Sequence, residues 1–363
     1  MLQVAEEFLE RKIHPRVIVT AYNRALVDSE EYLKTMALKL DTTSEANILK
    51  IIRSTIGTKF VSRYGDLICK LAYKAVNTVL ENDTDVKIDE KDPNWEHSNI
   101  NIDIKRFIRI EKIPGGLIEE SEVLDGILLN KDILHPKMKR RIENPRIICL
   151  DCPLEYNKGE SHTNIEITKT GDFEEYLKME EAYIQTICDQ LAALKPDIIV
   201  TEKGCAGQFN SFSLLLLLRR LKKTDNVRLA RACGAIIGHR VEMLKESDVG
   251  TGCGLFEVRS IADDYYSFFV KCKNPKACSV ILRGGSKDVL QEMWRNLEDA
   301  MAVTKNILKC PKILPGGGAT EMALSTYLLQ KSLTIEGSQA YPYKAVAKAL
   351  EVVPRHVSLH QKK

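Results

Sequence analysis

The chain has 363 residues, of which 44% are hydrophobic and 28% are charged, and its 53 Lys and Arg nearly cancel its 50 Asp and Glu to leave +3. This length predicts two or three domains with a sizeable core. The balanced charge argues against a nucleic-acid partner, which requires a concentrated basic face. The start resembles no secretory signal, and the longest apolar run, 214–218, is far shorter than a membrane span. We therefore expect a cytoplasmic protein with no membrane partner.

The ten cysteines lack the paired spacing of a zinc module or a disulfide framework, so we predict reduced thiols. Cys149 and Cys152 form a lone C-x-x-C between Ile147-Ile148 and Pro153. These neighbours favour a buried strand that runs into a turn over a metal or redox role.

Helices are predicted in the first part of the chain. Residues 16–35 carry apolar side chains at helical spacing after Pro15, and 45–56 follow a plausible N-cap at Thr43-Ser44. Apolar spacing over 67–79 predicts another helix.

A polar, acidic stretch at 82–103 then predicts an exposed loop, because no periodic apolar face is present. The alternating segment 106–112 predicts a strand that ends at the turn Ile113-Pro-Gly-Gly116. From there to about residue 283, short β-branched runs alternate with helical stretches, which is typical of an α/β layer. Strands are expected at 146–150, 197–201, 268–271 and 279–282, with an amphipathic helix over 173–191.

A long helix is predicted after Ser286, and the prolines at 311 and 315 end it. Its buried stripe is predicted to comprise Leu290, Met293, Leu297, Met301 and Leu308. Three glycines, 316–318, then lead into a last helix over 319–331.

Three features could serve a nucleotide, and each has a simpler interpretation. The backbone N–H groups of Gly316-Gly-Gly318 could face a phosphate, or the triplet could be a sharp turn that needs positive φ. Asp299 lies outside the apolar stripe and could orient an attacking water, but periodicity does not separate it from Glu298. Thr58-Lys59 follow the helix at 45–56, where a lysine could reach a phosphate or complement the helix C-terminus.

The sequence holds no G-x-x-x-x-G-K-[ST] loop, and Gly250-Thr-Gly-Cys-Gly254 lacks the helical pattern that should follow a phosphate cradle, so a loop turn is predicted there.

Several segments together resemble one family, the group II chaperonins, or TCP-1 family, known in eukaryotes as TRiC or CCT. They include EKIPGGLIEE at 111–120, KPDIIVTEKG at 195–204, NLEDA at 296–300 and PGGGATEM at 315–322. The resemblance follows the order of the family over residues 1 to about 355. Segments 158–161, 248–252 and 341–347 look most like the gamma subunits of this family.

The resemblance implies an α/β multidomain fold. A mostly helical partial equatorial domain would comprise 1–42 and 315–363, and an α/β intermediate hinge would comprise 43–116 and 278–314. An α/β apical substrate-binding domain at 117–277 would be inserted into this hinge, with a helical protrusion near 160–181.

By the same resemblance, the chain would be a subunit of TRiC/CCT that assists ATP-dependent protein folding by binding unfolded polypeptide. Its partners would be the other subunits of a hetero-oligomeric double ring and unfolded clients, and its cofactors would be ATP and Mg. Asp299 would position the hydrolytic water, and Thr58, Lys59, Gly316 and Gly317 would contact the nucleotide. No metal ligand of the chain is predicted.

The family's L-G-P and G-D-G-T-[TS] loops, which cradle the phosphates, are not found in this sequence, and the family pattern diverges after Val353-Pro-Arg355. We therefore expect negligible ATPase activity from the isolated chain, because phosphoryl transfer depends mainly on positioning and charge stabilisation. The alternatives are an ATP-independent polypeptide-binding fragment and a degenerate paralogue that cannot hydrolyse ATP.

Overall fold

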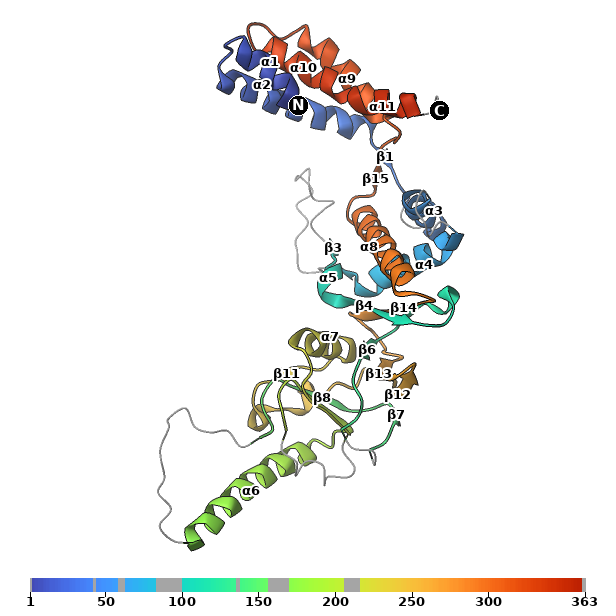
Figure 1. The fold of residues 1–363 in the computed structure, drawn as a ribbon. Helices are drawn as coiled ribbons and strands as arrows, with labels where there is room; N and C mark the ends of the chain where they lie inside the picture. The colour runs from blue at the N-terminus through green and yellow to red at the C-terminus, as the bar shows by residue number, and fades with distance from the viewer. Residues whose placement is uncertain are drawn as a thin grey trace. The chain divides into compact units, whose positions relative to one another are not determined.

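The computed structural model describes residues 2–41, 44–57, 63–82, 100–134, 138–155, 170–205 and 216–360. The chain forms two compact units (Figure 1). One unit joins Met1–Thr43 to Cys310–Lys363, and the other comprises Ser44–Lys309. In the described part of the chain, no helix has both the length and the apolar character that crossing a bilayer requires. The five-part division into equatorial, intermediate and apical segments stays a prediction.

The first unit is helical. It contains α1 (Leu2–Glu10), α2 (Pro15–Met36), α9 (Ala319–Ser332), α10 (Ala340–Leu350), α11 (Val352–His360) and a short antiparallel pair, β1 (Leu38–Lys39) with β15 (Lys312–Ile313). Pro15 begins α2, where its missing N–H is not needed, and His14 Nδ1 accepts a hydrogen bond from Arg16 N–H at 3.2 Å. Residues of α2, α9 and α10 and of the segment between α9 and α10 share one core, which comprises Ala21, Ala25, Leu328, Ile335, Tyr343, Val346 and Ala347. The helices predicted at 16–35 and 319–331 are confirmed.

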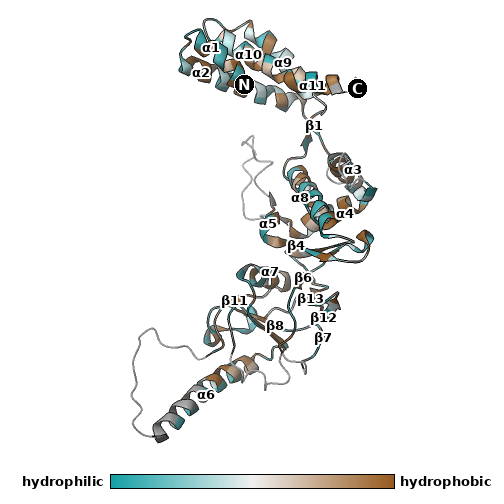
Figure 2. Cartoon of the chain, in the orientation of Figure 1, coloured by the Kyte–Doolittle hydropathy of each residue, from teal (hydrophilic) through white to brown (hydrophobic). Residues whose placement is uncertain are grey.

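In the second unit, two of three helices, α4 (Gly65–Val79) and α8 (Lys287–Lys309), contact a small mixed sheet, and the third, α3 (Glu45–Ile56), packs against both of them. The sheet has the order β4 (Ile108–Pro114), β14 (Cys278–Gly284), β5 (Glu122–Leu124). β14 runs parallel to β4 and antiparallel to β5. The colouring of α8 alternates between hydrophilic and hydrophobic residues, as expected for a helix that buries one side (Figure 2). The predicted helices are confirmed, but Ile307 rather than Leu308 completes the buried stripe of α8.

The segment before β4 differs from the prediction. The expected loop at 82–103 lies mostly outside the described residues, and β2 (Glu81–Asn82) pairs with β3 (Ile100–Asn101) at its ends. The strand predicted from Arg106 begins only at Ile108, because residues 104–107 form the short helix α5 (Ile104–Phe107). Asp103 caps this helix, since its Oδ1 accepts a hydrogen bond from Arg106 N–H at 3.2 Å.

A four-stranded parallel sheet forms the next layer, in the order β10 (Leu216–Leu218), β9 (Ile198–Thr201), β8 (Ile147–Leu150), β11 (Ile237–Gly238). Every residue of β8, β9 and β10 is buried, which explains their continuous apolar runs. The chain moves outward from β8 through α6 (Thr170–Ala193) to β9 and β10, then returns through α7 (Lys223–Cys233) to β11 on the other side of β8. The strand order therefore reverses direction between β8 and β11.

An antiparallel sheet completes the unit, in the order β6 (Ile127–Leu129), β13 (Asp264–Val270), β12 (Leu255–Ile261), β7 (Arg141–Glu143). β12 and β13 pair along their full length. Phe256 of β12 and Phe269 of β13 are paired residues, and their ring centroids lie 4.9 Å apart. Short 3-10 turns of this unit include η3 (Ile118–Glu120), η5 (Val241–Met243) and η6 (Glu246–Asp248). The four strands predicted at 146–150, 197–201, 268–271 and 279–282 are confirmed within a few residues.

Candidate functional site

Asp299 lies near the middle of α8, in the second unit. Its side chain is exposed, while Leu297, Ala300 and Met301 beside it are buried. A carboxylate held on a well-packed helix can accept a hydrogen bond from a water molecule and orient it. Glu298 is exposed as well, so burial does not separate the two carboxylates any better than periodicity does.

The predicted glycine turn is present in the first unit, at the start of α9. Gly317 and Gly318 have φ values of +69° and +84°, a region that favours glycine, and Met322 N–H donates to Gly318 O at 3.0 Å. A Cβ atom at Gly316 or Gly317 would have no heavy atom within 4 Å, so both glycines face open space. The turn therefore leaves backbone accessible at a helix N-terminus, where an anion can approach.

The remaining predicted nucleotide contacts, Thr58 and Lys59, lie outside the described residues. Asp299 belongs to the second unit, and the glycines belong to the first. The roles assigned to all five residues stay predictions.

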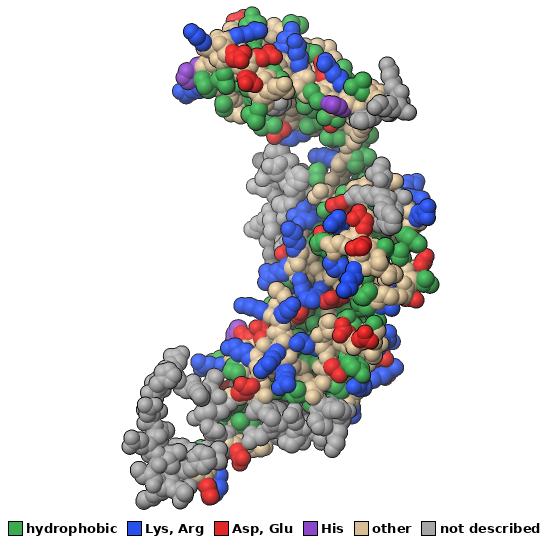
Figure 3. Space-filling model, viewed as in Figure 1, with side chains coloured by type: hydrophobic (Ala, Val, Ile, Leu, Met, Phe, Trp, Pro, Cys, Tyr) green, Lys and Arg blue, Asp and Glu red, His purple; other side chains and the backbone are tan. Residues whose placement is uncertain are grey.

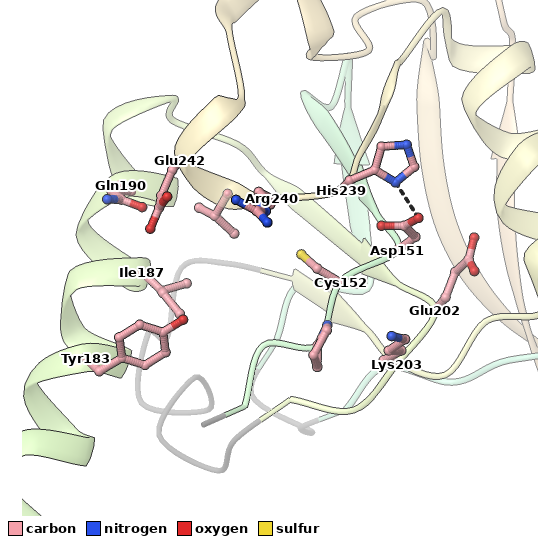
Figure 4. Close-up of a pocket in the computed structure, with 12 residues that line it drawn as sticks. Asp151, Cys152, Tyr183, Ile187, Gln190, Glu202, Lys203, His239, Arg240 and Glu242 are labelled. Atoms are coloured by element: carbon pink, nitrogen blue, oxygen red, sulfur yellow. Dashed lines mark hydrogen bonds and ion pairs between the residues drawn. The ribbon is translucent and has the colours of Figure 1, made fainter. Parts of the chain in front are cut away.

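A groove that we did not predict lies at the carboxyl ends of the parallel strands (Figure 4). Asp151 follows β8, Glu202 and Lys203 follow β9, and His239 and Arg240 follow β11. This position matches the general location of ligand sites in open α/β sheets, the crevice where the strand order reverses. The groove encloses about 480 Å³, a volume typical of sites for small molecules or peptide side chains.

Charged side chains line one wall of this groove. His239 follows β11 and Asp151 follows β8, on the two sides of the reversal point, and their Nδ1 and Oδ2 atoms are 2.5 Å apart. Side chains of both signs also line the groove, including Glu202, Lys203 and Glu242. The groove is therefore suited to polar or zwitterionic segments rather than to a purely apolar ligand.

Helix α6 supplies the opposite wall through Tyr183, Ile187 and Gln190 (Figure 4). The Oε1 atom of Gln190 is buried without a hydrogen-bond partner among the described residues. A buried amide oxygen without a hydrogen-bond partner costs free energy. A ligand N–H group that donates a hydrogen bond to Gln190 Oε1 would remove this cost.

One cysteine of the C-x-x-C pair lines the groove, but neither supplies a reactive thiol. Cys149 is fully buried in β8, as predicted, and burial raises its pKa to about 12. Cys152 lines the groove, and burial, with a smaller contribution from Asp151, raises its pKa as well. Both side chains therefore stay protonated at neutral pH, and neither is activated as a nucleophile.

Polar residues directly after three strands of the parallel sheet are the sequence signal that could have located this groove. Asp151, Glu202-Lys203 and His239-Arg240 each follow an apolar strand. The signal becomes specific only when the strand order is known, because the order decides which strand ends lie together.

The comparisons with known proteins agree with this architecture. The chain belongs to the TCP-1/cpn60 chaperonin family, whose model matches residues 1–358. Among curated relatives, it is 52% identical to T-complex protein 1 subunit gamma of Arabidopsis thaliana and 49% identical to that of Schizosaccharomyces pombe, in each case over 98% of this chain. The chain spans 62% and 65% of the length of these two relatives, respectively.

A solved structure of a group II chaperonin has the same fold. The open-state monomer of a group II chaperonin from Methanococcoides burtonii superposes with a TM-score of 0.69 at 26% sequence identity, covering 99% of this chain and 84% of that one. The α/β multidomain fold class and the resemblance to the gamma branch of the chaperonins, both predicted from the sequence, are confirmed.

Proposed function

We propose that this chain acts as a client-binding subunit of a hetero-oligomeric cytosolic chaperonin and assists ATP-dependent folding of other polypeptides. The observation that carries the proposal is the identity of 49–52% to T-complex protein 1 gamma subunits across 98% of the chain. Such identity over both units favours a shared role, because the match is not confined to one domain.

The nucleotide would bind at the residues that the family resemblance predicts. ATP with magnesium, when bound, would supply the chemistry of phosphoryl transfer. Gly316 and Gly317 fit this assignment because they keep the N-terminus of α9 free of side chains, and Thr58 and Lys59 complete the proposed contacts. Asp299 would hold a water molecule through its exposed carboxylate.

Client binding is assigned to the unit that holds the parallel sheet. Met179 and Tyr183 lie one turn apart on α6 and are 64% and 46% exposed, and Met243, in η5 beside α6, is 67% exposed. Together with the charged groove, these side chains offer apolar and polar contacts on neighbouring surface. Unfolded chains present both kinds of group, and exposed apolar patches commonly mark protein-binding surfaces.

Subunit packing is assigned to the helical unit. Val19, Leu26 and Val27 are all more than half exposed on α2, Leu333 is exposed at the end of α9, and Tyr341 is exposed at the start of α10. Figure 3 shows apolar side chains beside charges of both signs on the visible face of this unit. Apolar groups so exposed are commonly covered by a partner in oligomers.

The test is the native mass of the tagged chain in a cell extract, measured by gel filtration with and without ATP. We expect the chain to elute with the chaperonin particle and its other subunits, and with bound polypeptide that ATP releases. A chain that elutes alone, or as aggregate indifferent to ATP, would contradict the proposal.

A variant tests the client surface separately. Met179→Ser with Tyr183→Ser should reduce capture of a chemically unfolded reporter polypeptide without altering the elution of the particle. Met322→Ser, at a methionine that is 48% exposed on α9, is the matched control and should leave capture unchanged.

A further inference from the structure

Three buried cysteines, Cys233, Cys253 and Cys272, converge at one end of the antiparallel sheet. Their Sγ atoms all lie within 4.8 Å of one another, and the residues are 1%, 1% and 7% exposed. Cys233 ends α7, Cys253 lies two residues before β12, and Cys272 lies two residues after β13. The cluster therefore joins a helix to both strands of a hairpin.

The hairpin register brings two of the cysteines together. Leu255 pairs with Val270 at the end of β12–β13, so two further residues in each direction place Cys253 opposite Cys272 on the same side of the ribbon. Beyond them, Lys273 N–H donates to Gly252 O at 3.0 Å and keeps the two segments paired.

Glycines allow the third cysteine to approach. A Cβ atom at Gly252 would lie 2.7 Å from Cys233 O, and one at Gly254 would lie 2.7 Å from Lys271 O. Gly252 N–H also donates to Cys233 O at 2.9 Å. The alternating glycines of 250–254 thus serve close packing of the loop against the end of α7 and against β13, which gives them a role other than a phosphate cradle.

The thiols make only weak contacts with the surrounding backbone. Cys253 Sγ lies 3.4 Å from Leu255 O and 3.7 Å from Val270 O, and Cys272 Sγ lies 3.9 Å from Phe269 O. Because thiol hydrogen bonds are weak, replacing them with bonds to a metal ion would cost little. Three sulfurs bonded to one ion at about 2.3 Å would be separated by about 3.8–4.0 Å, so a contraction of less than about 1 Å per pair suffices.

We propose that Cys233, Cys253 and Cys272 form a site for a thiophilic cation, monovalent copper, held by three thiolates. Soft thiolate donors select soft ions such as monovalent copper and zinc. No further His, Cys, Asp or Glu within the described ranges joins the group, and closed zinc sites take four ligands. Monovalent copper accepts three sulfur ligands and so matches the donor number. Binding displaces the thiol protons to solvent and changes no oxidation state.

The consequence for the fold is a cross-link between α7 and the β12–β13 hairpin. The three cysteines are separated by about twenty residues each along the sequence, so the ion would close two loops at once. Sequence spacing gave no sign of this site, because its ligands come from three separate elements.

The test uses the full reduced chain under anaerobic conditions, titrated with monovalent copper against a competing chelator. We expect one copper per chain, a near-ultraviolet thiolate-to-copper band, and three thiols protected from a thiol reagent. Cys253→Ala should weaken binding at least tenfold and remove the band. Cys149→Ala, which removes an equally buried cysteine of β8, is the matched control and should bind as the parent chain does.

Cys272→Ala removes a second ligand and is titrated in the same way. The circular dichroism of each variant shows whether a loss of binding comes from the lost ligand or from a lost fold. The proposal fails if the parent chain takes up no more copper than Cys253→Ala does, or if Cys149→Ala loses binding equally. Uptake of zinc but not copper would overturn the three-coordinate assignment.

Discussion

Arg109 Nη1 donates a hydrogen bond to Asp225 Oδ1 at 2.7 Å, although the two residues lie 116 positions apart. Arg228 donates to the same oxygen at 2.9 Å, and Arg109 Nε donates to Glu111 at 2.5 Å. Burial lowers the pKa of Arg228, whereas for Arg109 the effect of burial is outweighed by Glu111 and Asp225, which raise its pKa. Asp225 and Glu111 together thus balance the charges of the two guanidinium groups, and the largely buried Asp225 joins α7 to β4.

Removing that carboxylate should strongly destabilise the second unit. Asp225→Ala leaves two guanidinium groups poorly compensated in a shielded site, and we expect the free energy of unfolding to fall by about 3 kcal/mol in urea denaturation. Glu143→Ala is the control, because the Arg141–Glu143 pair has side chains that are 60% and 71% exposed and should contribute less than about 0.5 kcal/mol. Equal losses in the two variants would contradict this account of the network.

The glycine turn before α9 offers a comparison between adjacent positions. Gly317 has a φ of +69°, whereas Gly316 is not in the left-handed region, and neither would bring a new Cβ within 4 Å of another atom. Gly317→Ala should therefore cost about 1–2 kcal/mol of stability through backbone strain alone. Gly316→Ala should be neutral or slightly stabilising. Thermal unfolding of the two variants measures the difference, and a Gly316→Ala variant as unstable as Gly317→Ala would show that strain is not the cause.

Asp28 makes the stability of the helical unit depend on pH. Lys331 Nζ and Tyr343 Oη donate to its two carboxylate oxygens, each at 2.7 Å. Burial raises the pKa of Asp28, but these hydrogen bonds outweigh it, and the net pKa lies below the usual value. A lowered folded-state pKa means that this stabilisation is complete above the unfolded pKa, about 3.9, and disappears as the pH falls through the folded value.

Asp28→Asn should accordingly lower the free energy of unfolding by about 2 kcal/mol at pH 7. The difference from the parent chain should stay constant down to about pH 5 and shrink below about pH 4. Urea denaturation from pH 7 to pH 3 measures it, with Glu31→Gln as a control at an exposed carboxylate of the same helix. A difference that persists unchanged at pH 3 would show that the charge of Asp28 is not its source.

The long periodic elements could be predicted from the sequence, and the short ones could not. The helices at 45–56, 67–79 and 287–309 repeat apolar residues over several turns, so their type and extent follow from the pattern. β11 has only two residues and β10 only three, too few for any period, although both complete the parallel sheet. The helices α10 and α11 also went unpredicted.

Some of the candidate sites could likewise be predicted from the sequence, and others could not. The glycine turn at 316–318 follows from composition and position, because few other residues tolerate its backbone angles. The groove and the cysteine cluster require tertiary structure, since their residues come from strand and helix ends far apart in the sequence. The choice between Asp299 and Glu298 rests on the family resemblance, because both carboxylates are exposed.

A substitution pair decides between those two carboxylates. If Asp299 orients the attacking water once the chain is in the assembled particle, Asp299→Asn should lower the ATP hydrolysis contributed there by the tagged chain by about 10²-fold or more, because the amide is a poorer proton acceptor than the carboxylate. Glu298→Gln removes the same charge from the neighbouring position on α8 and should leave the rate within about twofold. Nucleotide binding, measured with a fluorescent ATP analogue, should be unchanged in both variants, since the proposed contacts to the nucleotide are Thr58, Lys59, Gly316 and Gly317. A large loss in Glu298→Gln with little effect of Asp299→Asn would transfer the role to Glu298, and equal small losses would remove it from both.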